Sequence, residues 1–199
     1  MISFALFSAL ATFYFTMFFT PGPNNAMLTA SGMKFGFIRT LPHLIGISLG
    51  HIFQIGLTCF GLANIFLIYP EVQLYMKILC FLYLIYLSWK MIGSFSLTQK
   101  ETGRPLRFYE ASLFQFINPK AWSIAVTVAS GFFPTEENIF IGVAFVTITA
   151  ALINFPTCSL WALFGSGLRK FINNQKIKKI IEYLLAVLLV LTGLFILIK

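Results

Sequence analysis

Long apolar runs separated by short basic loops dominate this sequence. The runs are of a length that, as helices, crosses the hydrocarbon layer of a bilayer or most of it. We expect six spans at about Phe4–Phe19, Leu44–Tyr69, Val72–Ile92, Ser112–Phe133, Ile139–Gly165 and Ile180–Ile198. The pattern therefore predicts an all-α polytopic membrane protein, in which residues 1–199 form a single transmembrane domain.

Composition supports this class. Of the residues, 58% are hydrophobic and only 10% are charged, whereas soluble domains average about 25% charged residues. In a soluble protein the net charge of +8 would suggest nucleic acid as a partner. Here the cations lie in short loops between spans, so the charge indicates membrane orientation instead, with lipid and not nucleic acid as the partner.

The distribution of Lys and Arg predicts the orientation. Setting Lys120 aside, eleven cations fall in or beside the loops after spans one, three and five, against two on the other side. The eleven are Lys34, Arg39, Lys90, Lys100, Arg104, Arg107, Arg169, Lys170, Lys176, Lys178 and Lys179. Because Lys and Arg are enriched in cytoplasmic loops, we expect these loops inside and both termini outside.

The first span ends at a break with unusual chemistry. Thr20, Pro21, Gly22, Pro23, Asn24 and Asn25 follow one another directly. The two prolines lack a backbone donor and Gly22 is conformationally permissive, so a helix cannot run through unbroken. One hypothesis is that the freed backbone groups and the two amides line a substrate cavity. The alternative is that Pro-Gly-Pro merely ends the helix in a turn.

A second break falls in the corresponding position of the other half of the chain. The fourth span contains Asn118-Pro119-Lys120, and a residue before proline disfavours helical geometry. Six spans divide naturally into two halves, about 1–95 and 108–199, that run in opposite senses. Secondary transporters often contain such inverted repeats, with the substrate site at the broken helices. Two matching breaks favour the cavity hypothesis.

A zwitterionic substrate would find suitable partners at these breaks. Carbonyls freed by Pro21, Pro23 and Pro119, with the Asn24 and Asn118 oxygens, would accept from an ammonium group. Donors to a carboxylate would be Lys120, the amide groups at the half-helix starts and the Asn25 side chain. A site without a central carboxylate favours small neutral amino acids.

Several polar residues have two possible roles. Lys120 either binds a substrate carboxylate or extends its ammonium to the headgroups. Asn154 either binds substrate or joins helices. His51 titrates near neutral pH, so it carries a coupled proton or packs as a neutral ring. Glu110 is a second proton-coupling candidate, unless it simply pairs with a loop arginine. Gly46 and Gly50 are better explained by close helix packing.

The ordered motifs resemble those of the LysE/RhtB family of amino-acid exporters. The matching stretches are Thr20–Asn25, Gly46–Gly50, Leu82–Lys90 and Asn118–Lys120, and the Asn24-Asn25 pair is most similar to the cysteine/O-acetylserine exporter branch. The resemblance implies a bacterial inner-membrane secondary transporter, driven by the proton gradient. Its substrates would be small neutral amino acids or close derivatives, such as cysteine, O-acetylserine, threonine or homoserine. Glu110 and His51 depart from the family pattern.

Other classes fit less well. The three cysteines, Cys59, Cys80 and Cys158, form no C-x-x-C pair, which argues against a thiol-disulfide carrier. No Asp is present, and the two His show no ligand spacing typical of a metal site, so we expect neither an intramembrane enzyme, nor a metal site, nor a cofactor. A channel for small solutes and a non-transporting membrane scaffold remain as alternatives.

Overall fold

The described part of the chain is helical. The structure, a computed structural model, describes residues 2–62, 68–69, 71–92, 103–171 and 174–198. Its elements are α1 (Phe4–Phe19), α2 (Pro23–Phe35), α3 (Phe37–Leu57), a π-helical turn (Thr58–Leu62), α5 (Glu71–Met91), α6 (Phe108–Phe114), a 3-10 turn (Gln115–Ile117), α7 (Pro119–Gly131), α8 (Ile139–Leu168), a 3-10 turn (Arg169–Phe171) and α9 (Gln175–Ile198). The predicted all-α class is confirmed for these residues.

Both sequence breaks interrupt the helices as expected. Thr20 has an extended backbone conformation directly after α1. Pro23 occupies the first turn of α2, where its missing N–H breaks no hydrogen bond of the helix. The two helices meet at an angle of 55°. In the second break Asn118 is extended and Pro119 begins α7. The prolines and their neighbours thus explain where α1 and the turn before Asn118 end and where α2 and α7 begin.

By length and composition, two of the described helical stretches could cross a membrane, Phe37–Gly61 and Ile139–Leu168. A third span results if the bent pair α1–α2 counts as one. The first apolar segment therefore reaches beyond its expected end at Phe19, because a second half-helix follows the break. The second segment starts seven residues earlier than Leu44, directly after Gly36, whose φ of 82° ends α2. Residues 63–67, within the expected second span, lie outside the described residues.

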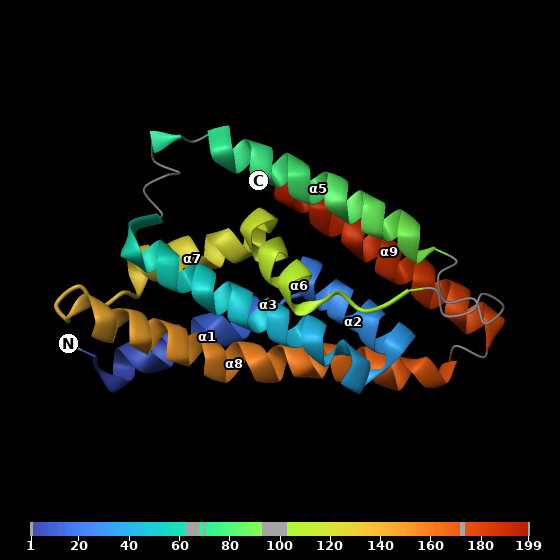
Figure 1. The fold of residues 1–199 in the computed structure, drawn as a ribbon, viewed down its shortest axis with the longest axis horizontal. Coiled ribbons are helices and arrows are strands. Elements are labelled where there is room, and N and C mark those ends of the chain that lie inside the picture. Colours follow the sequence, from blue (N-terminus) through green and yellow to red (C-terminus); the bar gives the residue numbers. More distant parts are fainter. Residues whose placement is uncertain (1, 63–67, 70, 93–102, 172–173, 199) are drawn as a thin grey trace.

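Figure 1 shows how the half-helices are arranged. α1 and α7 lie toward the end of the molecule that contains the N-terminus, and α2 and α6 lie farther along. α8 runs along α1, α2 and α3. α5 and α9 pack against each other as a separate pair, and α9 of this pair contacts α2. This arrangement brings the end of α1 next to the start of α7.

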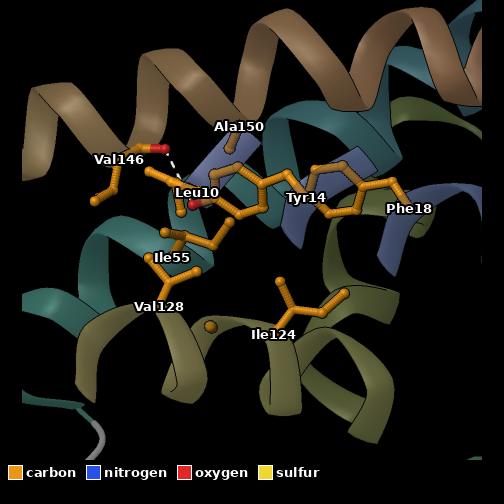
Figure 2. Close-up of a cluster of buried hydrophobic side chains, with 9 residues drawn as sticks. Leu10, Tyr14, Phe18, Ile55, Ile124, Val128, Val146 and Ala150 are labelled. Carbon is orange, nitrogen blue, oxygen red and sulfur yellow. Dashed lines mark hydrogen bonds between the residues drawn. The ribbon is translucent and has the colours of Figure 1, made fainter. Parts of the chain in front are cut away.

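An apolar cluster fixes α1 and α7 relative to each other. Figure 2 shows Leu10, Tyr14 and Phe18 of α1 pointing toward α3, α7 and α8. The partners are Ile55, Ile124, Ala125, Val128, Val146 and Ala150. Tyr14 is fully buried, and its hydroxyl donates a hydrogen bond of 3.1 Å to the carbonyl of Val146. The cluster therefore forms one wall beside the first break.

Glycines allow two pairs of helices to touch through their backbones. A Cβ added to Gly32 of α2 or to Gly165 of α8 would collide with the backbone of the opposite helix, at Ala162 and Thr29 respectively. Gly46 and Gly50 of α3 are in similar contact with α6. The interpretation of Gly46 and Gly50 as packing residues is confirmed, and small residues at such crossings are typical of membrane helices.

Candidate substrate site

The two breaks meet around a single small cavity. Its polar wall comes from both breaks and from two further helices, and consists of Asn24, Asn25, His51, Asn118, Lys120 and Asn154. Gly22 and Pro23 of the first break also line it. The expectation that the breaks lie together is therefore correct, although they are about a hundred residues apart along the chain.

Lys120 joins the two breaks directly. Its Nζ donates to the carbonyl oxygen of Thr20 at 2.7 Å and to that of Pro21 at 3.3 Å. Its stem lies against Gly22, where an added Cβ would stand 2.9 Å from Cδ and 3.0 Å from Nζ. The carbonyls at the C-terminal end of a helix carry partial negative charge, so this end of α1 is a favourable place for an ammonium group.

Asn25 also serves the end of α1. Its side-chain NH₂ donates to the carbonyls of Phe18 at 2.8 Å and Thr20 at 2.9 Å. These carbonyls lose helical partners at the break, and Asn25, only 5% exposed, replaces them. Its NH₂ therefore binds the backbone of α1 and not, as predicted from the sequence, a substrate carboxylate.

Asn24 pairs with a residue that the sequence argument did not consider. Its NH₂ donates to Oε1 of Gln115 at 2.8 Å, and Nε2 of Gln115 donates back to Oδ1 of Asn24 at 3.2 Å. Gln115 is fully buried in the turn before Asn118. This reciprocal amide pair is a second direct link between the two broken helices.

The remaining predicted polar residues complete the wall. Asn118 is the N-cap of α7, because its Oδ1 accepts a hydrogen bond from the backbone N–H of Lys120 at 3.1 Å. His51 of α3 places Nε2 at 3.3 Å from the carbonyl of Ala121. Asn154 of α8 accepts from the thiol of Cys158 at 3.5 Å. Each is almost fully buried.

Glu110 lies apart from the cavity, at the start of α6. Both of its oxygens accept from the guanidinium of Arg104 at 2.6 Å, and Oε2 also accepts from the backbone N–H of Arg107 at 2.7 Å. The hydrogen bonds from Arg104 and then from Arg107 lower the pKa of Glu110 to about 2. The carboxylate therefore stays ionised even at acidic pH, through the range in which a free glutamate takes up a proton.

Comparison with known proteins agrees with this geometry. Residues 15–199 match the family described as LysE type translocator. The chain belongs to this family. It is 30% identical over 161 residues to a cysteine/O-acetylserine efflux protein of Salmonella paratyphi A, covering 80% of this chain and 82% of the relative. The protein of the same name from Escherichia coli K12 is 29% identical over the same shares. No solved structure matches the chain.

As a LysE type translocator, the chain is a membrane protein. Three of its four expected motifs lie at the cavity or next to it. The Pro-Gly-Pro-Asn-Asn stretch and the Asn-Pro-Lys stretch face each other across the cavity. The Gly46–Gly50 stretch holds α3 against α6, immediately before the second break. The match over residues 15–199 and the relatives confirm the family resemblance of the sequence.

Two polar residues of this translocator escaped the sequence argument. Gln115 could have been found, since it is an amide three residues before Asn118 in an apolar stretch. Glu182 lies in the last expected span, and its side chain is only 3% exposed in α9. A lone carboxylate in an apolar stretch is a signal of the same kind. Within the described ranges no three His, Cys, Asp or Glu side chains are grouped as metal ligands would be.

The cavity is narrow. The space that the centre of a water molecule can occupy amounts to about 20 Å³, a little more than the roughly 10–15 Å³ needed for one water. An amino acid does not fit unless part of the wall moves. Lys120 is the longest flexible side chain in that wall and is held by two hydrogen bonds to backbone.

Proposed function

We propose that this translocator exports small neutral amino acids or close derivatives across the bacterial inner membrane, and that its substrate binds where the two breaks meet. The observation that carries the proposal is the cavity itself, which places carbonyl acceptors and cationic or amide donors side by side. The names of the relatives favour cysteine and O-acetylserine as substrates.

Each charged group of an amino acid has a suitable position here. The carbonyl oxygens of Thr20 and Pro21 already hold an ammonium, that of Lys120. The first turn of α2 has no side-chain cap, so the backbone N–H groups of Asn24 and Asn25 are suited to a carboxylate. Lys120 supplies positive charge beside them.

The wall also explains the preference for a small neutral side chain. The residues that line the cavity include no Asp or Glu. A second cation, as in lysine or arginine, would be desolvated there without a counter-ion. Met17, Ile124 and Cys158 offer a short apolar surface instead.

Exchange against protons is the proposed energy source. Of the two proton-coupling candidates, His51 lies in the cavity wall, next to Ala121 and Lys120. Glu110 lies outside the cavity in its pair with Arg104. We assign the proton to His51 and regard Glu110 as a brace for the start of α6.

We further propose the full arrangement of six spans as two inverted halves with both termini outside. The cation asymmetry and the antiparallel course of the two broken helices support it (Figure 1). Cysteines introduced at Glu136 and at Lys176, with the three native cysteines replaced, test the orientation. An impermeant thiol reagent added to intact cells should label position 136 and spare position 176. The reverse labelling would contradict the topology.

Purified protein in liposomes tests the export function. Vesicles loaded with cysteine, O-acetylserine, threonine or leucine should show saturable efflux that depends on the pH gradient. The controls are vesicles without protein and protein-containing vesicles loaded with lysine instead. Neither should show such efflux. Flux that does not saturate would favour a channel. The absence of flux for every substrate would favour the scaffold.

A further inference from the structure

The contact between Lys120 and the end of α1 has a second meaning beyond carboxylate binding. Nζ of Lys120 lies 2.7 Å from the carbonyl oxygen of Thr20 and 3.3 Å from that of Pro21. These are the acceptors that suit the ammonium of an amino acid. A primary ammonium on a lysine and one on a substrate have the same charge and the same donors.

We propose that Lys120 is a tethered substitute for the substrate's ammonium group, so that the Thr20 and Pro21 carbonyls form an ammonium subsite for which Lys120 and the substrate compete. The inference rests on the proposed export function and identifies the part of the substrate bound there. Two like charges on one pair of acceptors repel strongly in a poorly hydrated cavity. Binding of substrate therefore requires Lys120 to leave.

Departure of Lys120 also opens the space that a substrate needs. Its stem lies over Gly22 and lines the cavity, which in its present shape has room for water only. Once displaced, the same ammonium is free to pair with the substrate carboxylate. Lys120 thus occupies the ammonium subsite when substrate is absent, and it pairs with the substrate carboxylate when substrate is bound.

Occupation of the ammonium subsite by Lys120 would also be useful in a transport cycle. An exporter has to return with an empty site to collect its next substrate. Carbonyls left without donors at membrane depth are costly, and the carbonyls of Thr20 and Pro21 lie at a break where Pro21 and Pro23 supply no N–H. The Thr20 carbonyl also accepts from the side chain of Asn25 at 2.9 Å, whereas the Pro21 carbonyl accepts from Lys120. During the return Lys120 supplies the Pro21 carbonyl with a donor and the Thr20 carbonyl with a second one.

Binding of methylammonium to the purified full-length protein tests the competition. Methylammonium carries the donors of the substrate's amino group but no carboxylate, so only the ammonium subsite attracts it. Lys120→Met removes the competing charge and keeps a long side chain. We expect the affinity of this variant for methylammonium to be at least tenfold higher than that of the unmodified protein. The affinity is measured from the rise in melting temperature in detergent as methylammonium is added.

Matched controls separate the subsite from general charge effects. Tetramethylammonium has the same charge but no N–H, so its affinity should be the same for Lys120→Met and for the unmodified protein. Lys120→Arg keeps a cation near the carbonyls and should bind methylammonium no better than the unmodified protein. If Lys120→Met is not monodisperse, Lys120→Gln replaces it in the same titration.

An unchanged affinity, or an equal gain for tetramethylammonium, would overturn the inference, as would tight binding of methylammonium to Lys120→Arg. The liposome assay of amino-acid efflux reports separately on the export function. Failure of efflux with a clear methylammonium gain would remove the assignment as an exporter and leave the ammonium subsite in place. Normal efflux without a higher methylammonium affinity of Lys120→Met would remove the ammonium subsite and leave the assignment as an exporter in place.

Discussion

Lys120→Ala is expected to abolish amino-acid export while the protein still inserts into the membrane. The substitution removes the cation at the junction of α1 and α7 and the partner proposed for the substrate carboxylate. Loss of one buried charge-assisted contact weakens binding by roughly 2–5 kcal/mol, which corresponds to roughly 30-fold to several thousand-fold. Efflux of cysteine and O-acetylserine from cells, at matched membrane levels of protein, measures the effect.

Lys77→Ala is the matched control, because Lys77 belongs to α5 and does not line the cavity. It should export normally. Asn25→Ala should behave like Lys120→Ala, since its amide holds the carbonyls of Phe18 and Thr20. Normal export by Lys120→Ala would mean that Lys120 is only an anchor, and that the helix ends alone hold the carboxylate.

Gly165→Ala is expected to cause the largest loss of stability of any single methyl group added to α8. The new Cβ would collide with the backbone of Thr29 in α2, and a backbone cannot rotate away as a side chain can. Overpacking costs about 1–3 kcal/mol and more where backbone has to shift, so we expect about 3 kcal/mol or more. The melting temperature and the monodisperse yield in detergent should both fall.

Gly167→Ala provides the control on the same helix. Nothing lies within 4 Å of a Cβ added at Gly167, and alanine is the better helix former by about 1 kcal/mol. Its melting temperature should be unchanged or slightly higher. Equal stability of the two variants would show that α2 and α8 do not cross as closely as described.

These two experiments test different properties of α2 through its neighbours, since Lys120 of α7 contacts the break before α2 and Gly165 of α8 contacts α2 itself. α2 begins at the cavity, with Pro23 and Asn24 in its wall, and is clamped to α8 through Gly32 and Gly165. A variant at Lys120 should lose transport even when the inserted protein is present at a matched level. A variant at Gly165 should change stability first, and transport only as a consequence.

The amino-acid sequence determined the class of the protein and the places where its helices break. Apolar runs and basic loops follow from the requirement that a chain in lipid satisfy its own backbone groups. Pro21, Pro23 and Pro119 interrupt helices through their own covalent structure, so no tertiary information is needed to find the breaks. The motifs were also sufficient to indicate the family.

The tertiary structure alone decided what each polar group of the site contacts. Asn25 and Lys120 were both expected at the substrate carboxylate, yet both donate to carbonyls at the end of α1. The pairing of Asn24 with Gln115 was not foreseen at all. A hydrogen bond between residues 91 or 100 positions apart depends on how whole helices pack, and that packing depends on glycine crossings and apolar clusters spread over the entire chain. Local pattern shows which groups need partners, and only the packing of the helices selects the partners.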